Sequence, residues 1–227
     1  PNIIFSDCDF ESMLETTVHS SFSNQGEICL CGSRIFVEES LYKKFRDAFV
    51  EKTRSLIVGD PNDDQSDMGA LISKVHMDKV IGYIDLAKVE GGTILTGGSK
   101  ANINGRCKNG YFVEPTVFDG LSADCRTNQE EIFGPVVSLI PFVSEEEVIS
   151  MANSTEYGLS ATIWTEDKIK ADRVAEKLES GVVWVNCWMV RDLRTPFGGM
   201  KNSGVGREGG MGAMDFFTEQ KNICRKE

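Results

Sequence analysis

The sequence predicts an α/β fold with a largely parallel sheet. Short β-rich runs alternate with segments of helical periodicity, which is the order typical of parallel sheets covered by helices. The composition, 41% hydrophobic and 26% charged over 227 residues, is that of a globular protein with a sizeable core. No repeat of fixed period and no low-complexity segment points to another architecture.

The first half of the chain opens on Pro1–Phe5, an apolar run typical of a strand. A helix is expected after Asp9, which can cap it, because apolar residues recur at helical spacing from Phe10 to Phe22. Asn24-Gln25-Gly26 ends this helix. The elements expected next are a strand at Ile35–Val37, a helix capped by Ser40 that runs to about Ser55, a helix at Lys74–Glu90 and a strand at Ile94–Thr96.

The second half repeats the alternation. Tyr111–Phe118 and Val136–Phe142 are strand-like, and Ser144 followed by three glutamates starts a helix as a capping box would. The remaining expected elements are a strand at Leu159–Trp164, a helix at Asp167–Glu179, a strand at Val182–Val185 and a last strand within Phe216–Arg225.

Charge and apolar patterning exclude two classes of partner. The formal net charge is −11, whereas phosphate binding requires clustered Lys and Arg, so we expect no nucleic-acid partner. No apolar run approaches the roughly 18 residues of a membrane span, so we expect no membrane partner. The chain opens without an initiator Met inside a strand-like run, and we expect it to be part of a longer protein.

The seven cysteines are odd in number and scattered, which indicates free thiols in a reducing compartment and predicts a cytoplasmic protein. We expect no metal, because only two histidines are present and Cys29 with Cys31 is the single close cysteine pair. Gly204–Gly209 satisfies the G-x-G-x-x-G pattern but follows a glycine loop instead of a strand. We therefore interpret it as a loop and not as a dinucleotide fingerprint.

The local pattern around Cys29 is compatible with a nucleophile. It follows a helix stop, where a loop can expose a thiol and lower its pKa beside backbone N–H groups. A buried structural cysteine is the competing interpretation, and Cys31 lies in the same neighbourhood. Spacing alone leaves Cys29 and Cys31 nearly tied.

Two further segments can form a ligand pocket. The Gly-Pro turn that ends Glu130–Pro135 could aim an acidic side chain and an aromatic ring at a ligand, although a solvated Glu and a core Phe would fit as well. Val182–Gly204 passes from an apolar run through aromatics and arginines to a glycine loop, as a pocket wall on an α/β sheet does. Arg191 is suited to bidentate recognition of a carboxylate, whereas we interpret Arg194 as a surface arginine.

Taken together, these segments resemble the aldehyde dehydrogenase superfamily over essentially the whole chain. Their order and spacing make the resemblance specific where each motif alone is weak. The matching segments are Pro1–Phe5, Asn24–Cys29, Gly69–Ser73, Gly110–Val117, Glu130–Pro135, Tyr157–Ala161, Gly181–Asn186 and Pro196–Gly204.

The resemblance separates the two cysteines, because Cys29 falls on the catalytic cysteine of the family and Cys31 does not. Glu131 falls on the family's nicotinamide-ribose ligand and Phe133 on the aromatic that flanks the nicotinamide. His76 and Lys79 lie where a helix of the family approaches the cofactor. Glu27 departs from the family pattern, which more often has Gln; some branches carry Glu there.

The family resemblance implies an NAD-dependent oxidation, with NADP as an alternative. The Cys29 thiolate would attack an aldehyde, hydride would pass to the nicotinamide, and water would hydrolyse the resulting thioester to an acid. The family's general base, its oxyanion Asn and its Rossmann domain match no part of this sequence. We therefore expect residues 1–227 alone to lack dehydrogenase activity.

The run Val185–Phe197 resembles a narrower branch, the 2-aminomuconate and 2-hydroxymuconate semialdehyde dehydrogenases. Their substrates carry a carboxylate at the end opposite the aldehyde. Arg191 falls where this branch places an arginine for that carboxylate, and Trp188 and Phe197 would line the same pocket. A betaine-type or general aliphatic aldehyde dehydrogenase is the rival within the family, since it would not need Arg191.

Domain organisation also follows from the resemblance. We expect a catalytic domain at residues 1–214 and a C-terminal oligomerisation strand at residues 215–227, as in a homodimer or homotetramer. Two alternatives differ from an aldehyde dehydrogenase in function. One is an acyltransferase or esterase that uses the same cysteine, and the other is a truncated or crystallin-like paralogue with a structural role.

Overall fold

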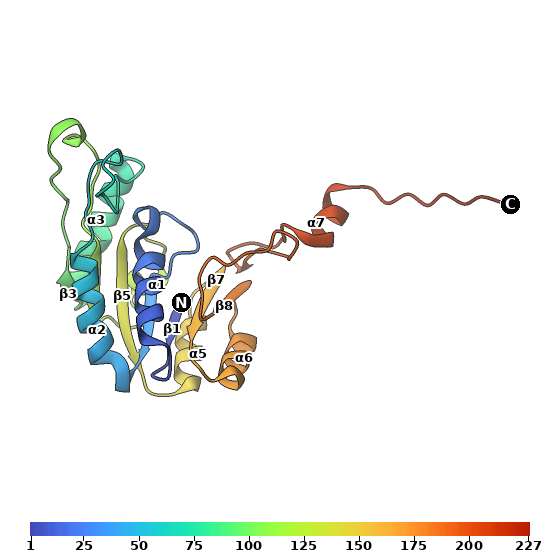
Figure 1. Ribbon diagram of the computed structural model, residues 1–227, viewed down its shortest axis with the longest axis horizontal. Helices are drawn as coiled ribbons and strands as arrows, with labels where there is room; N and C mark the ends of the chain where they lie inside the picture. The colour runs from blue at the N-terminus through green and yellow to red at the C-terminus, as the bar shows by residue number, and fades with distance from the viewer.

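A seven-stranded sheet lies between two layers of helices in the computed structural model, which describes residues 1–227 (Figure 1). The strands are β1 (Asn2–Ile4), β2 (Arg34–Glu38), β3 (Thr93–Thr96), β4 (Thr116–Asp119), β5 (Val136–Phe142), β6 (Tyr157–Gly158), β7 (Ser160–Trp164), β8 (Val182–Val185) and β9 (Met200–Lys201). The helices are α1 (Phe10–Phe22), α2 (Glu39–Arg54), α3 (Lys74–Val89), α4 (Arg126–Gln129), α5 (Glu145–Asn153), α6 (Lys168–Lys177) and α7 (Gly210–Phe217), with short 3₁₀ turns η1 (Ser23–Gly26) and η2 (Gly105–Cys107).

The order of strands in the main sheet is β3-β4-β5-β2-β1-β7-β8. All neighbours pair in parallel except the edge strand β3, which runs antiparallel to β4. Strands β6 and β9 form a separate antiparallel ribbon. The expected α/β fold with a largely parallel sheet is confirmed.

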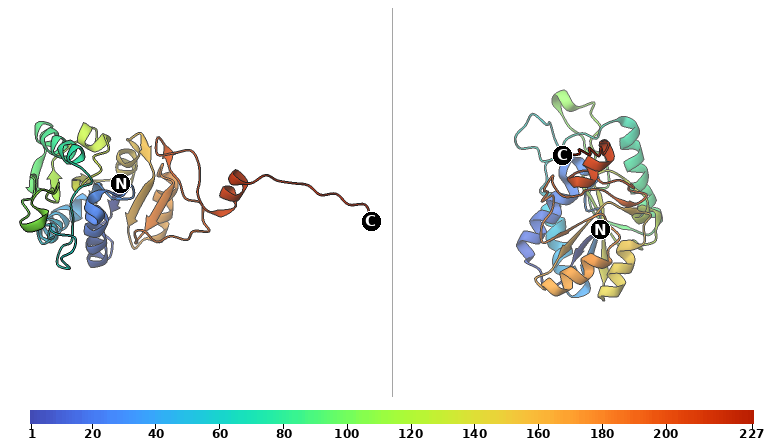
Figure 2. Two further views of the ribbon diagram at one scale, coloured as in Figure 1. Left: turned by 90° about the horizontal axis from the view of Figure 1, so that it is seen from above. Right: turned by 90° about the vertical axis from the view of Figure 1, so that its right-hand side faces the viewer.

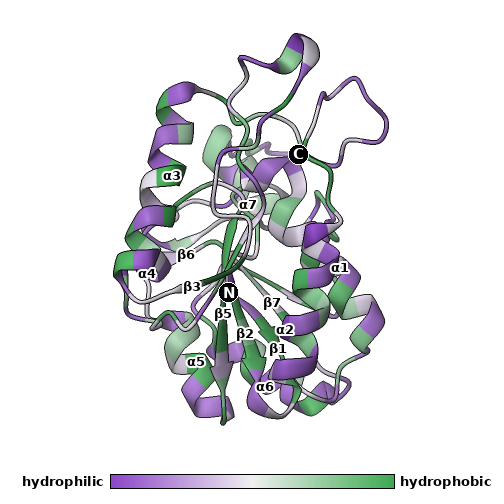
Figure 3. Cartoon of the chain, turned by 90° about the vertical axis from the view of Figure 1, so that its left-hand side faces the viewer, coloured by the Kyte–Doolittle hydropathy of each residue, from purple (hydrophilic) through white to green (hydrophobic).

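Apolar side chains from alternate positions of each strand fill two layers. Helices α1 and α2 cover one face, on which Ile35, Val37 and Leu139 lie, and α5 and α6 cover the other with Phe36 and Ile140. Helix α3 packs on this second face beyond β4. Figure 3 shows the result, with hydrophobic strands in the middle and hydrophilic outer helix surfaces. Strands that are buried on both faces have mostly apolar residues at successive positions. For this reason the strand Val136–Phe142 could be predicted from the sequence.

Most expected helix starts have the caps that the sequence suggests. The Asp9 side chain accepts a hydrogen bond from the N–H of Ser12, and the Ser144 hydroxyl accepts one from Glu147. Ser40 is not a cap, because α2 begins one residue earlier, at Glu39. No helix is both long and apolar enough to cross a membrane.

Two expected strands differ in the structure. Of Tyr111–Phe118, only the part from Thr116 onward joins the sheet, and the backbone before it bonds to neighbouring loops. At the C-terminus, Phe216 and Phe217 belong to helix α7 and residues 218–227 form no ladder. A strand needs a neighbour to pair with. This segment points away from the body, so no strand of the same chain lies beside it (Figure 2).

Phe49 is expected to contribute strongly to the stability of the core. Its ring is fully buried on α2 and stacks on Phe45 and Phe22 at centroid distances of 5.2 and 6.1 Å. We expect Phe49→Ala to lower the free energy of unfolding by about 3–5 kcal/mol, because it leaves a cavity between α2 and the sheet. Urea denaturation of the native protein measures this. Lys43→Ala, which removes only an exposed ion pair with Asp47 on the same helix, is expected to cost less than about 0.5 kcal/mol, and equal losses would contradict this view of the core.

Candidate active site

A cavity of about 340 Å³ lies at the amino ends of the parallel strands. Residues at or just before the starts of β1, β2, β5 and β7 line it, together with the loops that carry Cys29, Glu131 and Phe133. Open α/β sheets usually bind ligands at the carboxyl ends of their strands, so strand order alone would have pointed to the wrong end. The loops that enter β2 and β5 therefore build this site.

The loop before Cys29 is wound in the left-handed sense. Asn24, Gln25 and Gly26 have φ values of 49°, 58° and 73°. A Cβ at Gly26 would stand 2.3 Å from the carbonyl oxygen of Gly134, so only glycine allows this approach. Cys29 follows this turn with an exposed side chain, and its backbone N–H donates to no acceptor within the chain.

The structure separates the two neighbouring cysteines. Cys29 is exposed at the cavity, whereas Cys31 is partly buried and its thiol faces the carbonyl oxygen of Ser23 at 3.9 Å. Burial raises the pKa of the Cys31 thiol to about 11, an effect only partly opposed by a backbone hydrogen bond. The sequence left these residues nearly tied, and their surroundings now favour Cys29 as the accessible thiol.

We expect Cys29 and Cys31 to be alkylated at different rates, because one is exposed and the other is partly buried. At about pH 8, a thiol with a pKa of about 11 is ionised in roughly one molecule in a thousand, so Cys31 should react slowly. We expect iodoacetamide to label Cys29 at least about ten times faster than Cys31 in the folded protein. Peptide mass spectrometry against time measures both rates, and faster labelling of Cys31 would contradict the structure.

Glu131 and Phe133 line the same cavity, on the loop between α4 and β5. Phe133 adopts a φ of 60°, which is uncommon for a bulky residue. Two side chains of α3 hold this loop: the Lys79 ammonium donates to the carbonyl oxygen of Glu131 at 2.7 Å, and His76 Nε2 lies 2.6 Å from that of Phe133. The Glu131 carboxylate is exposed and has no hydrogen-bond or ion-pair partner.

The adjacent Glu130 is differently placed. It accepts hydrogen bonds from Arg126 and from the hydroxyl of Tyr83. These contacts lower the pKa of Glu130 to about 2, with the Arg126 hydrogen bond as the largest cause. Glu130 is therefore tied to its neighbours, whereas Glu131 remains free to accept hydrogen bonds from a ligand.

Arg191 and Phe197 meet outside this cavity. The Arg191 guanidinium lies over the Phe197 ring at 4.1 Å and makes an ion pair of 2.7 Å with Glu208. Phe197 and Glu208 exchange two backbone hydrogen bonds of 2.8 and 2.7 Å, which fix the cluster. The structure thus brings together two of the three residues expected to bind substrate.

Trp188 is the third, and it lies apart from this cluster. Its indole N–H donates to the carbonyl oxygen of Leu30 at 2.9 Å, one residue after Cys29. The ring packs edge-on against His19 of α1, beside a shallow groove. These contacts hold the indole against α1, and the pocket that Trp188 would share with Phe197 stays a prediction.

Sequence reasoning missed Glu208 and the contact between Gly26 and Gly134. Glu208 lies 17 residues after Arg191, and only the backbone pairing with Phe197 brings it near. No local pattern signals such pairing. Arg194, interpreted as a surface residue, is indeed exposed and bonded to Asp192.

Comparison with known proteins identifies relatives of this site. The model of the aldehyde dehydrogenase family matches residues 1–223. The chain is 54% identical to the 2-aminomuconic semialdehyde dehydrogenase of Danio rerio, over 100% of this chain and 47% of that protein. It is 46% identical to the 2-hydroxymuconic semialdehyde dehydrogenase of Pseudomonas sp. (strain CF600), over 99% of this chain and 46% of that protein. The chain thus spans about half the length of the curated relatives it matches.

Solved structures share the fold. A betaine aldehyde dehydrogenase of Staphylococcus aureus in complex with NAD+ superposes with a TM-score of 0.92 at 39% identity, over 96% of this chain and 43% of that one. An aldehyde dehydrogenase of Bacillus cereus does so with a TM-score of 0.91 at 41% identity, over 96% of this chain and 44% of that one.

Proposed function

Because the chain belongs to the aldehyde dehydrogenase family, we propose that the native protein oxidises an aldehyde to a carboxylic acid with Cys29 as the nucleophile. The observation that supports this proposal is the cavity that the exposed Cys29 lines together with the loop of Glu131 and Phe133. A thiolate in this position can attack a carbonyl carbon, and the Glu131–Phe133 loop can hold a second ligand in the same cavity.

The chemistry expected of this chain begins at the Cys29 sulfur. Its electron pair forms a carbon–sulfur bond as the carbonyl π pair moves to oxygen, which gives a thiohemiacetal. The Cys29 N–H has no acceptor within the chain, so it is free to donate to that oxygen. Once the thiohemiacetal has lost hydride and become a thioester, water attacks the thioester carbonyl and the carbon–sulfur bond breaks. Its electron pair returns to the Cys29 sulfur, and the carboxylic acid is released.

The cofactor proposed is NAD. When bound, it would supply the hydride acceptor that oxidation of the thiohemiacetal requires. The residues present fit such a group: the unpartnered Glu131 carboxylate can accept hydrogen bonds from sugar hydroxyls, and the Phe133 ring offers an apolar face. The relative from Staphylococcus aureus was solved with NAD+, which supports NAD over other oxidants.

The substrate proposed is a semialdehyde that carries a carboxylate at its other end. Arg191 supplies the guanidinium for that carboxylate, backed by the Phe197 ring. A guanidinium over an aromatic face keeps a fixed plane, which suits bidentate recognition. The names of the relatives, 2-aminomuconic and 2-hydroxymuconic semialdehyde dehydrogenases, support this class.

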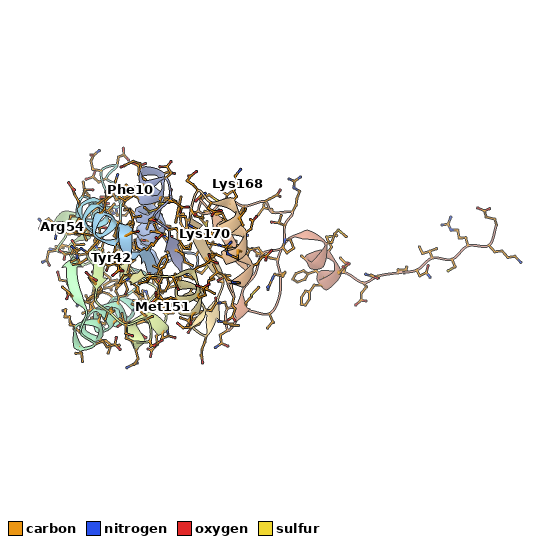
Figure 4. The ribbon with its side chains drawn as sticks, turned by 90° about the horizontal axis from the view of Figure 1, so that it is seen from below. Phe10, Tyr42, Arg54, Met151, Lys168 and Lys170 are labelled. Carbon is orange, nitrogen blue, oxygen red and sulfur yellow. The ribbon has the colours of Figure 1, made fainter.

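The C-terminal segment, residues 215–227, is proposed to join a second copy of the protein. Residues 215–227 are exposed, and so are the apolar side chains of Met214, Phe216 and Phe217. The segment extends away from the body of the molecule (Figure 4). Apolar side chains of this kind are typical of subunit contacts. Light scattering of the native protein tests for a dimer or tetramer. All seven cysteines are free, which supports a reducing compartment such as the cytoplasm.

NADH formation tests the proposed activity. The native protein is mixed with NAD and either a semialdehyde acid or a neutral aliphatic aldehyde, and NADH absorbance is followed. We expect turnover of both, with the higher kcat/KM for the semialdehyde acid. Ester hydrolysis without NADH formation would favour an esterase or acyltransferase, and no turnover of either kind would favour a structural role.

A further inference from the structure

Two side chains of the cysteine loop bind the segment that leads into helix α3. The Gln25 side-chain oxygen accepts a hydrogen bond from the N–H of Gly69 at 3.1 Å. Two residues on, Glu27 Oε1 accepts one from the N–H of Ile72 at 3.2 Å. The Glu27 side chain is only 10% exposed, so its carboxylate lies between the cysteine loop and the start of α3.

His76, in the first turn of α3, lies between this carboxylate and the loop that carries Phe133. Its Nε2 lies 2.6 Å from the carbonyl oxygen of Phe133 and 3.4 Å from Glu27 Oε1. A carbonyl oxygen only accepts, so Nε2 carries a proton and donates to Phe133. The Glu27 carboxylate lies beside the same ring nitrogen without a hydrogen bond to it, and the His76 side chain is 15% exposed.

The residue held by this hydrogen bond is in an unusual conformation. Phe133 has a φ of 60°, and such a backbone persists only where its surroundings stabilise it. The next residue, Gly134, touches the cysteine loop directly at Gly26. The two loops that line the cavity therefore touch at Gly26 and Gly134, and the Glu27–His76 pair is a second connection between them, a bridge that runs through α3.

We propose that Glu27 and His76 are positioning residues, which together set the placement of Cys29 relative to Phe133 and Glu131. This inference rests on the proposed function, since it concerns the nucleophile and the cofactor wall of that site. Neither residue lines the cavity, so neither is assigned a contact with substrate. Their effect passes through the Phe133 carbonyl and the cysteine loop.

The bridge also makes a physical link between cofactor and nucleophile. A ligand that orders the Phe133 turn acts on the His76 hydrogen bond, and through Glu27 on the loop of Cys29. We therefore expect NAD to change the reactivity of Cys29 only while the bridge is intact.

The test uses the native protein with four single variants of the Glu27–His76 pair and the double leucine variant. Glu27→Leu and His76→Leu break the bridge, whereas Glu27→Gln and His76→Gln keep an acceptor and a donor of suitable reach. Val75→Ala is the matched control, because Val75 lies in the same helical turn and is 81% exposed. For each protein, the rate of Cys29 alkylation by iodoacetamide is measured with and without NAD, beside kcat and both KM values.

In the unmutated protein and the control, we expect NAD to change the alkylation rate several-fold. The leucine variants should lose most of this response and about tenfold in kcat, with the KM for aldehyde unchanged, whereas the glutamine variants stay within about threefold. The double leucine variant should be no worse than either single one, because both remove the same bridge. Should a leucine variant fail to fold, Glu27→Asp and His76→Asn, which shorten the reach, take its place with the same expected losses.

The bridge is overturned if the breaking variants keep the NAD response and kcat of Val75→Ala, or if NAD leaves Cys29 reactivity unchanged in the unmutated protein. Failure of the proposed function has another signature: the unmutated protein then oxidises no aldehyde at all. The alkylation readout needs no turnover, so the two failures are distinguishable.

Discussion

Replacing Cys29 with serine is expected to reduce aldehyde oxidation by the native protein by at least about three orders of magnitude. Cys29 is the exposed thiol of the cavity, and a serine hydroxyl in its place is almost never ionised near neutral pH. The KM for NAD should change little, because the Glu131 and Phe133 wall is untouched. Initial rates of NADH formation measure both parameters.

Cys31→Ser is the matched control for this variant. Cys31 lies two residues away but is partly buried, and burial keeps its thiol protonated by raising its pKa to about 11. We expect the Cys31 variant to retain activity within about threefold. Loss of activity in Cys31→Ser with retention in Cys29→Ser would exchange the two roles.

Removal of the Arg191 guanidinium is expected to act on one class of substrate only. Arg191→Ala should raise the KM for a semialdehyde acid about 10- to 100-fold, since a charge-assisted bidentate hydrogen bond contributes about 1.5–3 kcal/mol. The KM for a neutral aldehyde of similar length should stay within about threefold. Steady-state kinetics on both substrates measure the difference.

One further variant separates charge from side-chain geometry at position 191, and a second, at Arg194, is the control. Arg191→Lys keeps the charge but lacks the planar fork that lies over Phe197, so we expect it to recover only part of the loss. Arg194→Ala, which removes an exposed arginine bonded to Asp192, should leave both KM values unchanged. Equal losses on acid and neutral substrates in Arg191→Ala would refute the carboxylate assignment.

The sheet was largely predictable because its strands are rich in apolar residues. The central strand β5 is buried on both faces and matches the expected Val136–Phe142 in full, and the edge strand β8, although partly exposed, matches the expected Val182–Val185. Helix starts that are set by a capping side chain, such as Asp9, could also be predicted from the sequence. The C-terminal strand was not, since strand formation depends on a neighbour and local preference placed Phe216 and Phe217 in a helix.

The site was predictable only in part, for a physical reason. Motifs identified Cys29, Glu131 and Phe133, which the fold places around one cavity. The choice between Cys29 and Cys31 came from the family resemblance. The structure adds that the Cys29 side chain is exposed, whereas that of Cys31 is partly buried.

Long-range contacts were outside the reach of local patterns. The Arg191–Glu208 ion pair depends on backbone pairing at Phe197, and the Glu27–His76 contact depends on how α3 meets the cysteine loop. Neither pair is close in sequence, so periodicity and spacing carry no signal for either.

Covalent trapping tests the central claim most directly. The native protein is mixed with NAD and a semialdehyde acid, quenched in acid during turnover, digested and analysed by peptide mass spectrometry. We expect an acyl group on the peptide that contains Cys29, absent when NAD is omitted and absent in Cys29→Ser. An acyl group on another residue, or turnover that persists in Cys29→Ser, would contradict it.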